Sequence, residues 1–154
     1  MNYTELEEKL GKQIKSDWHQ ASGGGWIHKN ARVGNEDNIR HNSIVMDNAV
    51  VSGCAIVSDN AIVSDNAIVM DNAWVSGNAQ VSGDARVYDN ARVSGNARVY
   101  DNARVYDNAR VSGKALVFGN AKVYGNAQVS GSAYICGNAV ICDNAWVSGK
   151  GKRD

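Results

Sequence analysis

A six-residue alternation of apolar and polar positions runs without interruption through residues 25–150. Counted from Ala31, the third position of every hexad is Val or Ile, and the first is Ala throughout residues 49–145. One residue lies between these two apolar positions, and this alternation is typical of a β-strand with one buried face. The fifth position is Gly or Asp throughout residues 47–149, and the sixth is mostly Asn. Because these residues tolerate positive φ, each hexad is predicted to form a short strand that ends in a tight turn.

The outward residues repeat with a longer period of 18, which is three hexads. Serine occupies the fourth position in every third hexad, and tyrosine recurs at the same spacing one hexad earlier: Ser58, Ser76, Ser94, Ser112, Ser130 and Ser148, and Tyr88, Tyr106 and Tyr124. Three hexads per coil predict a triangular solenoid, in which neighbouring coils pair as parallel strands around a narrow core. The 21 hexads make about seven coils. The predicted fold class is an all-β, single-stranded parallel β-helix with a short N-terminal α-helix.

The repeated phrase also resembles a known family. Val-x-[Gly/Asp]-Asn-Ala-x is similar to the hexapeptide repeat of left-handed β-helix proteins over residues 25–150. The stretch Gly24-Gly25-Trp26-Ile27, followed by dense Asn-Ala-Arg-Val phrases, resembles bacterial and phage YdcK-like hexapeptide proteins, which are often labelled acyltransferases. The resemblance implies left-handed coiling, whereas the general preference for right-handed crossovers favours the opposite hand. It also implies a homotrimer, as in most hexapeptide enzymes.

The ends of the chain depart from the repeat, which divides it into residues 1–24, 25–150 and 151–154. Thr4 and Glu7 have the spacing of a capping box. Apolar residues then recur at three- and four-residue steps, which predicts an amphipathic helix over residues 1–20: Tyr3, Leu6, Leu10, Ile14 and Trp18. A glycine-rich link follows. This helix is expected either to cap the open first coil, whose strand edges are otherwise unpaired, or to pack on a partner subunit. Residues 151–154 are expected to form a frayed polar tail.

Apolar residues also occupy the outward second position on all three faces of the second and third coils, namely Ile44, Val50, Ile56, Ile62, Ile68 and Trp74. So much apolar surface requires a cover, which is either the N-terminal helix or another subunit. The Ser column offers a flat face for close approach, with Trp74 and Trp146 as anchors. The predicted oligomer interface comprises Leu6, Leu10, Ile14, Ile56, Ile62, Ile68, Trp74 and Trp146.

The sequence offers little for catalysis. Hexapeptide acyltransferases need a His base beside an extruded loop, yet no His and no insertion occur after Ser43. His28 is the base if the protein is an acetyl-CoA-dependent acyltransferase, although a solvated surface role is expected for it. His28 and His41 are not at stacked positions, so a zinc site of the carbonic anhydrase kind is not predicted. Neither a nucleophilic triad nor a phosphate-binding loop is present.

One constellation of outward residues points to binding. Each of three stacked tyrosines follows a cation by two residues on the same face, giving Arg86 and Tyr88, Arg104 and Tyr106, and Lys122 and Tyr124. Parallel ladders of cations and rings can hold a nucleotide, a sugar phosphate or an acidic chain. Asp71, Asp89 and Asp107 lie at the corner of this face and can instead neutralise the cations, which leaves a balanced, solvated surface.

Charge and composition narrow the function classes. Sixteen basic residues balance sixteen acidic ones, so no global field attracts nucleic acid or an anionic membrane. No apolar run is long enough to span a membrane, and the three cysteines fit free thiols, so a cytoplasmic location is expected. The leading hypothesis is a non-catalytic or degenerate scaffold, oligomeric and without a cofactor, that presents its faces to a protein or a small anionic ligand. The alternatives are an acyltransferase acting at a subunit interface and, for a phage-borne gene, an accessory factor that binds a host protein or a signalling nucleotide.

Overall fold

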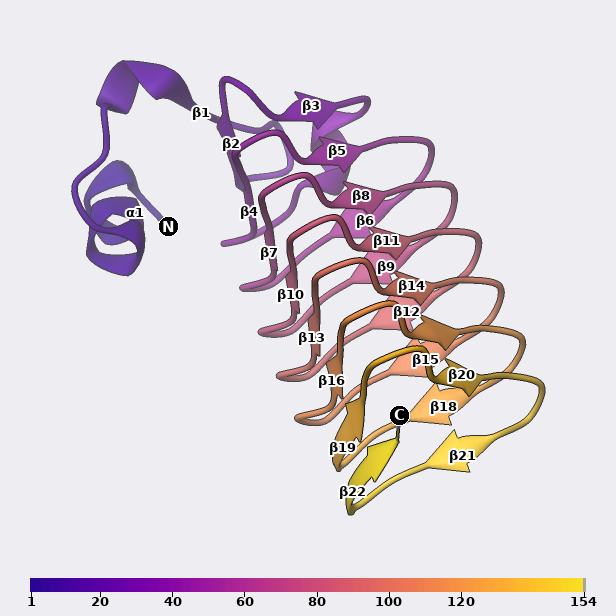
Figure 1. The fold of residues 1–154 in the computed structure, drawn as a ribbon. Coiled ribbons are helices and arrows are strands. Elements are labelled where there is room, and N and C mark those ends of the chain that lie inside the picture. Colours follow the sequence, from indigo (N-terminus) through magenta and orange to yellow (C-terminus); the bar gives the residue numbers. More distant parts are fainter. Residues whose placement is uncertain (154) are drawn as a thin grey trace.

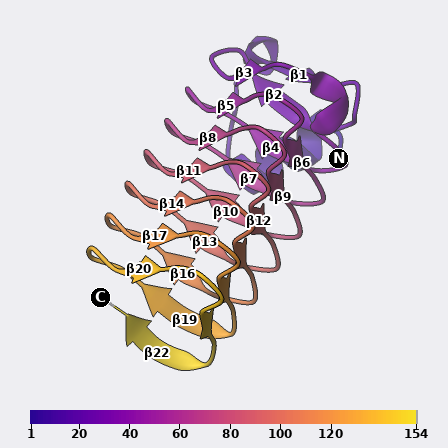
Figure 2. The same cartoon turned by 90° about the vertical axis from the view of Figure 1, so that its right-hand side faces the viewer.

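The computed structural model describes the backbone of residues 1–153 and the side chains of residues 1–149. One short helix, α1 (Tyr3–Leu10), and two 3-10 turns, η1 (Lys15–Asp17) and η2 (Glu36–Asn38), accompany three sheets that share the long axis of a β-solenoid (Figure 1). The strands of each sheet succeed one another along this axis, and the helix and the C-terminal strand lie at opposite ends (Figure 2). The predicted β-solenoid of about seven 18-residue coils is thus confirmed.

Each of the middle coils contributes one short strand to each sheet. The nine-stranded sheet contains β1 (Trp18–Gln20), β2 (Trp26–His28), β4 (Ile44–Val45), β7 (Ile62–Val63), β10 (Gln80–Val81), β13 (Arg98–Val99), β16 (Leu116–Val117), β19 (Ser132–Ile135) and β22 (Lys150–Arg153). The seven-stranded sheet contains β3 (Arg32–Val33), β5 (Val50–Val51), β8 (Ile68–Val69), β11 (Arg86–Val87), β14 (Arg104–Val105), β17 (Lys122–Val123) and β20 (Val140–Ile141). The six-stranded sheet contains β6 (Ile56–Val57), β9 (Trp74–Val75), β12 (Arg92–Val93), β15 (Arg110–Val111), β18 (Gln128–Val129) and β21 (Trp146–Val147).

The register between coils follows from the period of the sequence. β11 pairs with β14 in parallel, and Arg86 and Val87 face Arg104 and Val105, 18 residues further along the chain. The same offset relates the other parallel strands. Each residue of the repeat is therefore stacked on its equivalent in the neighbouring coils, and every outward side chain becomes part of a column that runs along the solenoid.

The core consists of the two inward columns. The Ala and Val side chains of residues 61–129 at these positions have no exposed surface, as Ala103 and Val105 illustrate. Such small side chains suit a narrow triangular interior, in which three strands per coil approach one another closely. In each hexad, the side chains at the second and fourth positions are therefore the ones that face outward from the strand.

The predicted turns are confirmed at the fifth position of the hexads. Aspartates here adopt left-handed backbone conformations, with φ of 56° at both Asp89 and Asp107, and glycines elsewhere in the series do the same. The Asp side chains have a second role, because their carboxylates accept hydrogen bonds from the backbone of the next coil. Asp107 Oδ2, for example, accepts from the N–H of Gly125 at 3.0 Å.

The prediction for the N-terminal helix was wrong in its length and its cap. The helix ends at Leu10, and its capping box is formed by Asn2 and Glu5 instead of Thr4 and Glu7. Gly11 follows with φ of 82°, a conformation that ends the helix. Ile14 is consequently not on the helix and is largely exposed, while Trp18 begins β1 and pairs antiparallel with β2.

The helix covers the side of the solenoid and does not cap its open end. It thus covers part of the apolar outward surface of the N-terminal coils, which was one of the two alternatives expected for that surface. Leu6 is fully buried against Trp18, Trp26 and Ile44, which form a second hydrophobic cluster on the outer side of the nine-stranded sheet. Leu10 and Ile62 pack against this cluster. The inclusion of Leu6 in an oligomer interface was therefore wrong. β1 pairs antiparallel with β2 and is the first edge strand of this sheet.

Two further expectations need correction. The third hexad of the repeat forms η2 in place of a strand and touches the six-stranded sheet only through a bridge between Ile39 and Val57. The expected frayed tail is also different, because the backbone of residues 150–153 forms β22, parallel to β19. Asp154, the last residue of that expected tail, lies outside the described residues.

Candidate functional site

The predicted cation ladder is present on the seven-stranded sheet. Arg86, Arg104 and Lys122 are the first residues of β11, β14 and β17, and each faces the next in the strand register. All three are exposed. One coil separates neighbouring members, so three positive charges follow the solenoid axis at intervals of about 4.8 Å.

A stack of phenol rings runs beside the cations. The centroids of Tyr88 and Tyr106 are 4.9 Å apart with their planes 2° from parallel, and Tyr106 and Tyr124 are also 4.9 Å apart. All three side chains are half-buried. Burial is the main cause that raises the pKa of the Tyr88 and Tyr106 phenols, while the positive charge of Arg104 opposes this shift. At neutral pH these phenols are therefore uncharged hydroxyl groups.

The acidic residues at the corner of this face do not pair with the cations. Asp71 and Asp89 accept hydrogen bonds from the backbone N–H groups of Asp89 and Asp107, at 3.3 Å each, and Asp107 accepts from Gly125. Within the part of the chain that the structure describes, every ion pair lies among residues 1–59. The alternative of a face neutralised by Asp–Arg pairs is therefore not what the geometry shows. The aspartates serve the turns.

The remaining faces carry fewer cations in the same coils. The six-stranded sheet has Arg92 and Arg110 in register, and the guanidinium of Arg92 lies over the ring of Trp74 at 5.6 Å. The nine-stranded sheet has Arg98 between Gln80 and Leu116. The seven-stranded face is thus the most cationic of the three, and it alone combines three stacked cations with three stacked tyrosines.

The structure places His28 away from these ladders. Its ring packs edge-on against Trp18 with centroids 5.0 Å apart, and its Nδ1 accepts a hydrogen bond from the N–H of Asn30 at 3.4 Å. These contacts hold His28 at the N-terminal end of the stack. Among the described residues, no group of three or more His, Cys, Asp or Glu side chains is arranged to hold a metal ion.

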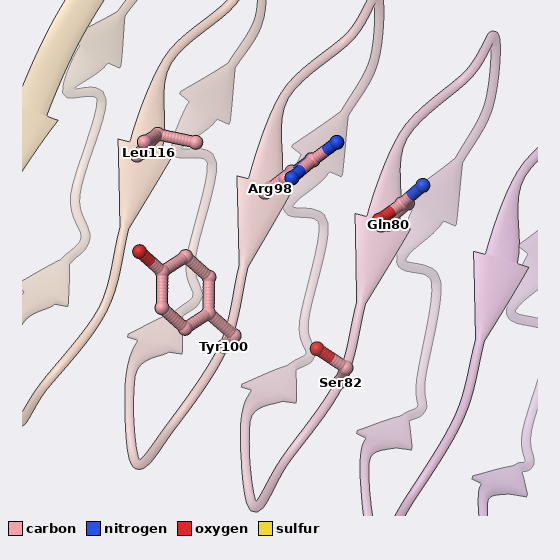
Figure 3. A pocket seen from close by; sticks show the side chains of 5 residues that line it. All are labelled: Gln80, Ser82, Arg98, Tyr100 and Leu116. Atoms are coloured by element: carbon pink, nitrogen blue, oxygen red, sulfur yellow. The ribbon is translucent and has the colours of Figure 1, made fainter.

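A groove on the nine-stranded face was not predicted from the sequence. Gln80, Ser82, Arg98, Tyr100 and Leu116 line a depression of about 210 Å³ (Figure 3). Its sequence signal was a second aromatic pair at the 18-residue spacing, Tyr100 and Phe118, whose rings stack with centroids 4.9 Å apart. This groove is separate from the predicted ladder, which lies on another side of the solenoid.

The six-stranded face holds Trp146, the most exposed of the predicted interface residues, together with Trp74. Trp74 is 40% exposed and Trp146 is 76% exposed, whereas Ile56 on the same face and Ile68 on the seven-stranded face are half-buried. Between the two Trp residues the outward fourth positions are serines, followed at the corner by the glycines Gly77, Gly95, Gly113 and Gly131. The fourth and fifth positions of this face are therefore small in the middle, with an indole near each end, and a depression of about 250 Å³ lies beside Trp74.

These observations define the protein first as a β-solenoid with 18-residue coils. Comparison with known families makes the class more specific: the YdcK β-solenoid repeat matches residues 79–95, 91–105 and 103–119. These stretches include β11 to β15 and most of both aromatic ladders. The matches and the fold agree with a YdcK-like repeat family. No curated protein matches the chain. Among the described residues, no helix is long and apolar enough to cross a membrane.

Proposed function

We propose that this β-solenoid is a non-catalytic binding scaffold whose seven-stranded face binds an extended anionic ligand. The observation that carries the proposal is the ladder of Arg86, Arg104 and Lys122, which has no acidic partner among the described residues and lies beside three stacked phenols. An anion with charges repeated along its length matches a row of cations repeated along the solenoid. The tyrosine hydroxyls add hydrogen-bond donors beside the charges.

The energetics of the ladder favour an anionic partner. Like charges at directly opposite positions of neighbouring strands repel, and each additional stacked cation increases this cost. The rigid core holds the three cations in register whether or not a ligand is present, so binding requires little ordering of the backbone. A bound anion relieves the repulsion and gains charge-assisted hydrogen bonds. Both effects weaken with salt, because the groups are exposed to solvent.

The proposal is tested with linear inorganic polyphosphate in titration calorimetry at low ionic strength. Charge reversal in the double variant Arg86→Glu, Arg104→Glu should weaken binding at least about tenfold, equivalent to about 1.4 kcal/mol. The matched control is Lys12→Glu, Arg98→Glu, which replaces two exposed cations away from the ladder and the six-stranded face and changes the net charge equally. Equal loss in both variants would show that only net charge matters and would overturn the assignment to this face.

We propose that copies of the chain associate through the six-stranded face, and that the oligomer is a homotrimer. The Ser and Gly columns allow close approach, and the exposed indoles of Trp74 and Trp146 supply anchors of the kind that dominate interfaces. The apolar cover of the nine-stranded face is already provided by α1. The resemblance to hexapeptide proteins favours three subunits over two.

Sedimentation at micromolar concentration tests the association. The native chain should sediment as a trimer, and Trp146→Ser should shift it toward monomer, whereas Ile14→Ser removes an exposed apolar residue that is not on this face. A monomeric native chain would remove the proposal. We also infer from the resemblance that the coils are left-handed, which a crystal structure with right-handed coils would contradict.

A further inference from the structure

The groove on the nine-stranded face lies at the end of a stack of two aromatic rings. In the hexads that contain β10, β13 and β16, the fourth positions are Ser82, Tyr100 and Phe118, each one coil from the next. One face of the Tyr100 ring stacks on Phe118 with planes 1° from parallel. The place where a further ring would continue the stack belongs to Ser82, whose side chain is too short to cover the phenol. The groove therefore lies at the open end of the stack.

Polar and charged side chains lie beside the aromatic ring of Tyr100 in this groove. Figure 3 shows Ser82 and Tyr100 along one side of the groove, with Gln80, Arg98 and Leu116 along the other. Arg98 is exposed and belongs to no ion pair among the described residues. The groove thus combines an uncovered aromatic surface, a guanidinium, an amide and a hydroxyl within a volume of about 210 Å³.

The other two faces place larger side chains beside their aromatic rings. On the seven-stranded face the residue one coil before Tyr88 is Met70, a long apolar side chain that is half-buried. On the six-stranded face the guanidinium of Arg92 lies over the ring of Trp74 at 5.6 Å, and a depression of about 250 Å³ remains beside them. Neither cover is present on the nine-stranded face, because Ser82 is small. The opening there lies at the end of a two-ring stack, because the fourth positions one and two coils before Tyr100 are the small residues Ser82 and Ser64.

We propose that this groove binds a single-ring aromatic carboxylate. The ring of the ligand stacks on the free face of Tyr100 in the place that an aromatic side chain at position 82 would fill, and its carboxylate pairs with Arg98. Planar rings prefer offset stacking of this kind, and a guanidinium binds a carboxylate through two parallel hydrogen bonds. A volume of about 210 Å³ is below the range of drug-sized pockets and suits one ring better than two. The site is distinct from the cation ladder and extends the function beyond it.

Proton NMR with benzoate as the probe tests this site. Benzoate should show saturable upfield shifts at millimolar concentration, since stacking on Tyr100 places its protons in the ring current. Cyclohexanecarboxylate carries the same charge without a planar ring, and benzyl alcohol carries the ring without the charge. Both should bind at least about tenfold more weakly, because each loses one of the two interactions. A non-saturable benzoate titration, or equal binding of cyclohexanecarboxylate, would overturn the proposal.

Two variants locate the site. Ser82→Tyr fills the opening with the chain's own ring and should abolish benzoate binding, while Arg98→Gln should weaken it about tenfold without altering the stack. Ser52→Tyr adds the same bulk to the seven-stranded face, outside the cation ladder, and is the matched control for Ser82→Tyr. Unchanged binding in both Ser82→Tyr and Arg98→Gln would assign benzoate to another place and refute the proposal. The Arg86→Glu, Arg104→Glu variant should bind benzoate normally. The experiment therefore tests the groove separately from the cation ladder.

Discussion

The N-terminal coils and the central coils of this solenoid share one core but differ in what faces outward. Around β4 and β7 the outward residues are Ile44 and Ile62, and α1 covers them through Leu6. Around β11 and β14 the outward residues are Arg86 and Arg104, and no element of the described chain lies over them. The backbone register is the same in both regions. The inward residues of each hexad therefore build the scaffold, whereas the outward residues decide what covers it.

The largest expected effect tests whether the core is truly shared by the two regions. Val45→Asp and Val87→Asp each place a carboxylate at a fully buried position, one in the helix-covered coils and one in the central coils. Each should destabilise the protein by about 4 kcal/mol or more in urea unfolding, because a buried unpaired charge has no compensating partner. Arg86→Asp, the outward neighbour of Val87, should change stability by less than about 0.5 kcal/mol. A harmless Val45→Asp would show that the N-terminal coils do not contribute to the common core.

The next effect distinguishes the covered region from the open one. Leu6→Ala leaves a cavity under α1 and should cost about 2–5 kcal/mol locally. In a solenoid each coil contacts only its neighbours, so hydrogen exchange should accelerate in β2 and β4 while β11 and β14 stay protected. Ile14→Ala removes an exposed side chain and is the control. Uniform acceleration along the whole chain would contradict the separation of the two regions.

A smaller effect concerns the turns of the central coils. Asp107→Ala retains a side chain at φ of 56° but loses the hydrogen bond to the backbone N–H of Gly125. The combined loss should be about 1–3 kcal/mol in thermal unfolding, since Ala avoids the left-handed conformation and the N–H loses its partner. Asp107→Gly relieves the conformational cost and should recover part of the loss. Should the two variants be equally stable, the positive φ would not matter here.

The smallest effect is a pH dependence that belongs to the central coils. Burial raises the pKa of Tyr88 and Tyr106 above the ordinary 10.0. A raised phenol pKa means that the unfolded chain ionises first, so stability is complete below pH 10 and declines as the pH rises through the folded-state pKa. The double variant Tyr88→Phe, Tyr106→Phe should flatten this decline in alkaline unfolding curves. An identical decline in the variant would assign it to other groups.

Predictability from the sequence differed between the repeat and its ends. The 18-residue columns, the Ala and Val core and the left-handed turns follow from local chemistry repeated many times, and all were predicted. The helix boundary was missed because the apolar spacing of Ile14 and Trp18 fits a helix, while Gly11 ends the helix and Trp18 pairs instead with β2. The groove at Tyr100 was missed because it depends on a small neighbour one coil away and on a guanidinium beside it.

The sequence by itself determined the solenoid, its period and the residues that form each outward column, because a strict repeat leaves one consistent register between coils. Only the tertiary structure decided where α1 packs, that the corner aspartates bind backbone N–H groups instead of the arginines, and that Ser82 leaves a ring of the second ladder uncovered. Those outcomes depend on distances between side chains that the repeat brings together but does not specify. The 18-residue spacing is enough to define a column of side chains. A hydrogen bond or an opening within that column depends on the positions of the side-chain atoms.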